Sequence, residues 1–121
     1  MTKNSNSRQY DLEDRTFNFA KDFRRFVQNL KKTISNIEDG KQLIRSSGSV
    51  GANYIEANEA LSKKDFLMRI KICRKESKES RYWLRLVETN GLPALEADRD
   101  KLTKESQELM NIFGAILQKS K

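Results

Sequence analysis

The sequence contains no histidine and only one cysteine, Cys73. The absence of histidine excludes Ser-His and Cys-His nucleophile pairs and imidazole metal ligands. A single cysteine permits neither an internal disulfide nor a cysteine-based zinc site, which is typical of a reducing compartment. The chain also lacks a run of about 18 uncharged apolar residues and the apolar core of a signal peptide. We therefore expect a soluble, cytoplasmic protein with no metal, no cofactor and no membrane contact.

Apolar residues are also scarce. They make up 36% of the 121 residues, whereas 34% are charged. This length fits one domain, and the low apolar content suggests that burial is completed in an oligomer. Lysine and arginine number 24 against 17 aspartates and glutamates, which gives a formal charge of +7. This composition indicates binding or assembly, and we expect no enzymatic activity.

Hydrophobic spacing predicts four helices and no strand of useful length. The helices are expected at about 12–34, 42–61, 63–89 and 94–118. Turn chemistry around Asp39-Gly40 predicts a break over residues 35–41. A capping box at Ser62 opens the third helix, and Asn90-Gly91 ends it. Short connections between long amphipathic helices imply an all-α fold, an antiparallel up-down four-helix bundle assembled as a ring-like homo-oligomer.

The core of this bundle is predicted from heptad stripes. On the first segment the stripe is Thr16, Ala20, Phe23, Val27, Leu30 and Ile34, with Phe19 and Phe26 on its flank. On the second and third it is Leu43, Ser47, Val50, Tyr54, Ala57 and Leu61, then Phe66, Ile70, Cys73, Ser77, Ser80, Leu84 and Val87. On the fourth it runs through Leu102, Ser106, Leu109, Phe113 and Ile116. Residues 1–10 are expected to be flexible, and residues 11–121 to form the bundle domain.

The positive charge falls on two helix faces rather than over the whole surface. In the heptad frames of the first and third segments, eleven cations share arcs opposite the core stripes: Lys21, Arg24, Arg25, Lys31, Lys32, Lys71, Arg74, Lys75, Lys78, Arg81 and Arg85. Two such faces fit a phosphate backbone, and binding through them would depend strongly on salt. The alternative is that they are ordinary solvated helix faces. Aromatic residues do not interleave with these cations, so stacking of the kind used by single-strand binders is not predicted.

Polar residues also lie beside the apolar stripes of the second and third segments. We expect them to form a structural or interface network between helices or subunits, because buried carboxylates need partners: Arg45, Ser49, Asn53, Glu56, Glu76 and Glu79. A carboxylate metal site is the competing interpretation. The di-iron pattern requires Glu-x-x-His on two helices, which a chain without histidine does not have.

Two stretches carry a family resemblance. Gln42 to Ser47 and Ser49 to Ala57 are similar to the second-helix motif of the bacterial four-helix bundle proteins, also called the 23S rRNA intervening-sequence protein family. Lys71 to Leu86, with its Lys-Glu pair and Tyr-Trp-Leu, resembles the third-helix motif of that family. The resemblance covers about residues 10 to 119. The chain departs from the pattern at Gly51, where many relatives have proline, and after Glu56, where glycine often follows.

The resemblance implies a left-handed up-down bundle that assembles as a homopentamer and has no established enzymatic activity. Many relatives are encoded within intervening sequences of the large-subunit rRNA gene and are labelled ribosomal proteins for that reason. A related branch, the accessory variability protein of diversity-generating retroelements, forms a basic pentameric barrel that partners a reverse transcriptase and nucleic acid. Asn53, Glu56, Glu76 and Glu79 match positions that the family favours, as structural or interface residues.

Two functional hypotheses follow. The first is a non-enzymatic, basic, oligomeric protein that binds RNA, or alternatively DNA, through its phosphate backbone. Five copies would carry five times +7, or +35, so that several weak contacts could add through multivalency. The second is a protein-interaction scaffold that docks a partner enzyme such as a reverse transcriptase, with nucleic-acid contact secondary or absent.

Overall fold

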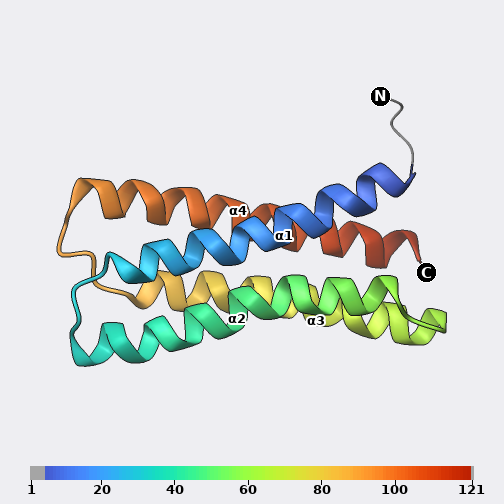
Figure 1. The fold of residues 1–121 in the computed structure, drawn as a ribbon, viewed down its shortest axis with the longest axis horizontal. Coiled ribbons are helices and arrows are strands. Elements are labelled where there is room, and N and C mark those ends of the chain that lie inside the picture. The colour runs from blue at the N-terminus through green and yellow to red at the C-terminus, as the bar shows by residue number, and fades with distance from the viewer. Residues whose placement is uncertain (1–4, 121) are drawn as a thin grey trace.

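The structure is a computed structural model that describes the backbone of residues 5–120 and the side chains of residues 11–120. It contains four helices and, within residues 5–120, no strand (Figure 1): α1 (Ser5–Gln28), α2 (Ile34–Asn58), α3 (Lys63–Leu86) and α4 (Pro93–Lys119). The flexibility predicted for residues 1–10 falls partly on residues 1–4, outside the described residues. None of the four helices is both long enough and apolar enough to cross a membrane.

The connection between α1 and α2 lies earlier than the sequence predicts. Residues 35–41, the expected break, are helical, and the chain turns between Gln28 and Ile34. The reason is Thr33, whose side chain caps α2 by accepting a hydrogen bond from the backbone N–H of Asn36 at 3.1 Å. Gly40 has a packing role inside α2, because a Cβ at that position would meet Val27 Cγ1 at 3.0 Å. The glycine therefore permits close approach of α1 and α2.

The other two connections follow the predicted signals closely. Ser62 Oγ accepts a hydrogen bond from the backbone N–H of Asp65 at 3.1 Å and caps α3. Asn90 and Gly91 adopt φ values of 57° and 67°, the left-handed conformation that stops a helix, although α3 itself ends at Leu86. Pro93 then starts α4, where its missing N–H costs no hydrogen bond.

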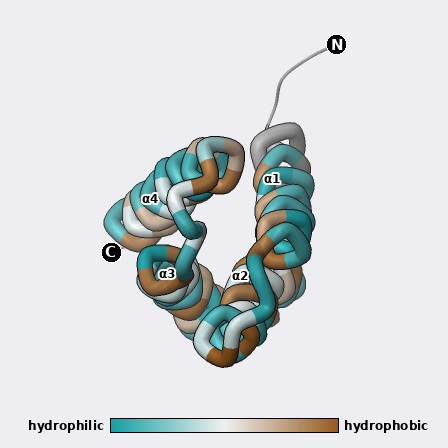
Figure 2. The backbone as a smooth tube through the Cα atoms, turned by 90° about the vertical axis from the view of Figure 1, so that its left-hand side faces the viewer, coloured by the Kyte–Doolittle hydropathy of each residue, from teal (hydrophilic) through white to brown (hydrophobic). Residues whose placement is uncertain are grey.

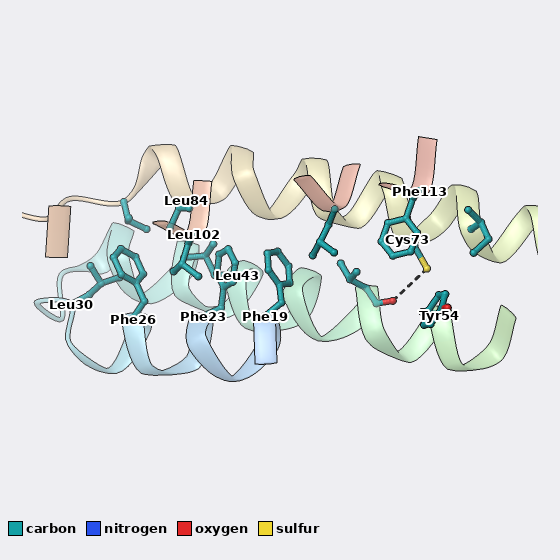
Figure 3. Packing of buried hydrophobic residues seen from close by; sticks show 14 of the residues in the cluster. Phe19, Phe23, Phe26, Leu30, Leu43, Tyr54, Cys73, Leu84, Leu102 and Phe113 are labelled. Atoms are coloured by element: carbon teal, nitrogen blue, oxygen red, sulfur yellow. Dashed lines mark hydrogen bonds between the residues drawn. The ribbon is translucent and has the colours of Figure 1, made fainter. Parts of the chain in front are cut away.

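The helices surround one hydrophobic core (Figure 3). The heptad positions of α2, α3 and α4 are buried almost without exception. On α1 the buried stripe passes through Phe19, Phe23 and Phe26 instead of Ala20 and Val27, because the three large rings fill the centre. The Phe19 and Phe23 rings meet edge to face, with centroids 4.7 Å apart. Leu61, expected at the end of the second stripe, lies beyond α2 and is 99% exposed.

The helices contact one another in cyclic order, as the end-on view shows (Figure 2). α1 packs on α2, α2 on α3 and α3 on α4, while α1 and α4 meet over a shorter stretch. Within the described residues the backbones of α1 and α3 do not adjoin, nor do those of α2 and α4, although the Tyr54 and Phe113 rings meet across the core with centroids 6.0 Å apart. The α1–α2 and α3–α4 seams are therefore opposite edges of the bundle, and this arrangement decides where the charged faces lie.

Candidate nucleic-acid interface

The cations of α3 lie along the seam between α3 and α4. Arg81 Nη1 donates a hydrogen bond to Gln107 Oε1 of α4. About two helical turns before Arg81, Arg74 extends over α4. A Cβ at Gly114 of α4 would lie 3.8 Å from Arg74 Nε. The two helices run antiparallel, so each step along α3 toward its N-terminus meets a later residue of α4 (Figure 1). The cationic face predicted for the third helix therefore lies beside α4, along the line where α3 and α4 meet.

A groove of about 600 Å³ opens at this seam. Its α3 side is formed by four of the predicted nucleic-acid-binding residues: Lys71, Arg74, Lys75 and Lys78. Its α4 side is formed by Met110, Gly114, Leu117 and Gln118. The groove therefore combines a cationic rim with a largely apolar floor, and the floor is a feature that the charge pattern of α3 does not predict.

Most of the α3 cations have no acidic partner. Lys71, Arg74, Lys78 and Arg85 are exposed and form no ion pair with any carboxylate of the described residues. Lys75 Nζ lies 4.0 Å from Glu79 Oε2, at the limit for an ion pair. An unneutralised row of this kind produces a positive potential that attracts an anionic ligand.

The cations of α1 are more fully engaged within the protein. Arg25 pairs with Asp22 at 3.2 Å, and Lys21 Nζ lies 5.6 Å from the centroid of the Phe17 ring. Arg24 donates to the carbonyl of Ala20 at 3.2 Å and reaches α2, where a Cβ on Gly48 would lie 3.5 Å from its Nη2. Arg24 therefore lies at the α1–α2 seam, whereas Arg25 lines a groove between α1 and α4 together with Asp98 and Lys101.

The two remaining cations of the predicted first face do not lie on α1. Lys31 and Lys32 follow its end at Gln28 and sit in the connection to α2. There they line a small groove of about 180 Å³ together with Lys41 of α2. The first face is therefore divided between a helix and a loop. Because the backbones of α1 and α3 do not adjoin within the described residues, the first face and the α3 row are separate surfaces of a single chain.

A second group of predicted residues meets at the α2–α3 interface. Arg45 of α2 donates to Glu76 Oε2 at 2.8 Å and to Glu79 Oε1 at 3.1 Å. Further along, Asn53 Oδ1 accepts from Arg69 at 2.9 Å, and Asn53 Nδ2 donates to Ser49 at 2.9 and 3.0 Å. The contacts of Arg45 and Arg69 join α2 to α3, whereas the Asn53–Ser49 bonds lie within α2.

Glu56 lies outside this network. It is exposed, and among the described residues it forms no hydrogen bond or ion pair through its side chain. The described residues contain no cluster of three or more Cys, Asp or Glu side chains that could hold a metal ion.

Sequence reasoning missed two polar contacts that tie the bundle together. Arg15 of α1 clamps α4 through Glu105, with Nε–Oε2 and Nη2–Oε1 distances of 2.7 Å, and also reaches Glu108 at 3.1 Å. Hydrogen bonding to Glu105 raises the pKa of Arg15.

The second contact is made by Asn36, which is buried and forms hydrogen bonds with the backbone of Lys31 and Glu88. The cap formed by Thr33 and the backbone N–H of Asn36 is local and recognisable in the sequence Thr33-Ile34-Ser35-Asn36. The partner of the Asn36 side chain, Glu88, lies 52 residues away, and no local pattern indicates it.

Comparison with known proteins agrees with this fold. The family model described as the 23S rRNA-intervening sequence protein matches residues 8–115. A crystal structure from Bacteroides thetaiotaomicron, described as a protein with unknown function from the S23 ribosomal protein family, is 26% identical with a TM-score of 0.76. The match covers 91% of this chain and 97% of that chain. A search of curated proteins finds no match. The chain thus belongs to the 23S rRNA-intervening sequence protein family.

Proposed function

We propose that this protein binds nucleic acid, with RNA favoured, through phosphate contacts made by the cations along the α3–α4 seam. The observation that carries the proposal is the exposed row of α3 cations without carboxylate partners. Each phosphate that such a cation neutralises releases counterions, which favours binding at low salt. The α1 cations, with their internal contacts, contribute less on a single chain.

Assembly into a homo-oligomer is part of the proposal. Large apolar side chains remain exposed on α2 and α3, among them Ile55, Tyr82 and Leu86. The buried Trp83 Nε1 of α3 has no hydrogen-bond partner among the described residues. Surfaces of this kind are typical of protein interfaces. Several copies of the α3 row in one assembly would strengthen weak phosphate contacts through multivalency.

The test measures binding of a fluorescent hairpin RNA to the full chain by anisotropy, from about 50 to 200 mM salt. Replacing Lys71, Arg74 and Lys78 by glutamine should weaken binding and flatten the slope of log K against log salt by about 2 to 3. The matched control replaces Lys21, Arg24 and Arg25, which removes the same charge from α1, a helix that contributes no residue to the α3–α4 groove. This control should change the slope by less than about one.

Two outcomes would overturn the proposal. If both triple variants weaken binding equally, net charge rather than the α3 row is responsible. If the wild-type protein does not bind RNA or DNA at low salt, the alternative of a scaffold for a partner protein is favoured. A pull-down with nuclease treatment then identifies that role, because a direct protein partner survives digestion.

A further inference from the structure

We propose that the α3–α4 groove holds an unpaired nucleotide of the bound RNA. Its base would lie on the α4 floor, and its flanking phosphates would contact the α3 cations. This inference rests on the proposed function and adds a preference that phosphate contacts alone do not give. It predicts that the protein distinguishes RNA with an extruded base from fully paired RNA.

The floor of the groove is shaped to accept a flat apolar group. Met110 and Leu117 are half-buried, so each presents part of its side chain to the groove. Gly114 lies between them on α4 and has no side chain to fill the space. A methionine thioether makes favourable contacts with aromatic rings, which include nucleobases. The volume of about 600 Å³ is within the range of small-molecule pockets.

Arg74 supplies the group that aromatic residues supply in other RNA-binding proteins. Its guanidinium approaches the α4 backbone at Gly114 and has no carboxylate partner among the described residues. A planar guanidinium can stack on a base while it remains charged. Gln118, exposed at the end of the groove, carries an amide that can donate to and accept from a base edge.

The cations along the α3 side of the groove are spaced so that they could contact the phosphates on either side of such a nucleotide. Lys71, Arg74 and Lys78 follow one another at about one helical turn, or roughly 5.4 Å along the axis. A paired base is held inside its duplex and cannot reach the floor, whereas bases in loops and bulges are free to be splayed out. The groove therefore discriminates by whether a base is available.

The experiment compares two hairpin RNAs of equal stem length, one fully paired and one with a single bulged adenosine. Anisotropy at fixed salt should show the bulged RNA binding the wild-type chain about fivefold more tightly, or better. Gly114→Leu should fill the groove and abolish this preference, so that the bulged and paired hairpins bind the variant with equal affinity. The variant should fold, because a Cβ at Gly114 makes only ordinary contacts, with Arg74.

Matched controls separate the groove from general effects. Ala115→Leu adds the same side chain at the next, exposed position of α4 and should retain the preference. Arg74→Lys keeps the charge but loses the planar group, so it should reduce the preference, whereas Arg85→Lys outside the groove should not.

Equal affinity of the wild-type chain for the two RNAs would overturn this inference and leave the proposed function intact. A preference that survives Gly114→Leu would also overturn it, since the base would then be bound elsewhere. Failure to bind either RNA would instead contradict the proposed function itself.

Discussion

Arg45 Nη1 of α2 lies 2.8 Å from Glu76 Oε2 of α3, and the two side chains differ sharply in exposure. The glutamate side chain is 5% exposed, whereas the arginine side chain is 51% exposed. Arg45 thus covers a buried carboxylate from the solvent side and extends to Glu79 at 3.1 Å. Beside this pair, Ser80 Oγ donates to Ser46 Oγ at 2.9 Å. These contacts fix the register of α2 against α3.

Replacing Arg45 alone should therefore destabilise the protein more than replacing Arg45 and Glu76 together. We expect Arg45→Met to lower the free energy of unfolding by about 1 to 3 kcal/mol, because Glu76 is left buried without its partner. The double variant Arg45→Met/Glu76→Met should recover most of that loss. Urea denaturation of both variants measures the difference. As a control, Glu79→Gln at the more exposed carboxylate should change stability by less than about 1 kcal/mol. A double variant no more stable than Arg45→Met would contradict this account.

Substitution of the buried Asn36 should lower the stability of the protein more than substitution of most other polar residues. Its Nδ2 donates to the carbonyls of Lys31 and Glu88 at 2.9 and 3.0 Å, and its Oδ1 accepts from the Glu88 N–H at 2.9 Å. Asn36→Ala removes the partner of the Glu88 N–H and carbonyl, whereas the Lys31 carbonyl still accepts from the Thr33 N–H at 3.0 Å. We expect a loss of about 2 to 3 kcal/mol in thermal or chemical unfolding. Asn29→Ala provides the comparison, since exposed Asn29 makes one side-chain bond, to the Arg25 carbonyl. Equal losses in the two variants would count against the bridging role of Asn36.

The thiol of Cys73 should be inert in the folded protein and should make stability depend on pH. Burial raises its pKa from the ordinary 9.0 to about 12, and its Sγ lies 3.4 Å from the Val50 carbonyl, to which it donates. Above pH 9 the unfolded chain loses the thiol proton while the folded chain keeps it. Stability contributed by this group is thus complete below pH 9 and decreases as the pH rises toward 12.

Two measurements check this prediction. Reaction with a thiol reagent at pH 8 should be slow in the native protein and fast after unfolding. Between pH 9 and pH 10 the free energy of unfolding should fall by about 1 kcal/mol more in the wild type than in Cys73→Ala. Burial also raises the pKa of Tyr54, and the charge of Cys73 raises it further, so the difference between the two proteins reports the thiol together with its effect on Tyr54. Identical pH profiles would exclude the effect.

Sequence signals such as caps, turn residues and heptad spacing predicted the structure correctly where it depends on residues of a single helix or turn. The Ser62 cap, the left-handed Asn90-Gly91 and the buried heptad residues such as Leu43 and Ile70 all depend on neighbours within a few turns. The break before α2 was misplaced because Asp39-Gly40 has the composition of a turn. Thr33 caps α2 ahead of these residues, and Gly40 lies inside the helix, where a Cβ would meet Val27 Cγ1 of α1 at 3.0 Å.

The candidate site divides in the same way. Helical periodicity by itself determined that Lys71, Arg74 and Lys78 share one face of α3, since residues three and four apart lie together on any helix. The tertiary structure decided which neighbour that face meets, and so placed Gly114 of α4 opposite Arg74 to form a groove. It also placed Arg24 beside α2 and Arg25 beside α4, so that the cations of α1 point to different neighbours. A pattern along one helix contains no information about the helix beside it, because that pairing depends on how all four apolar stripes pack together.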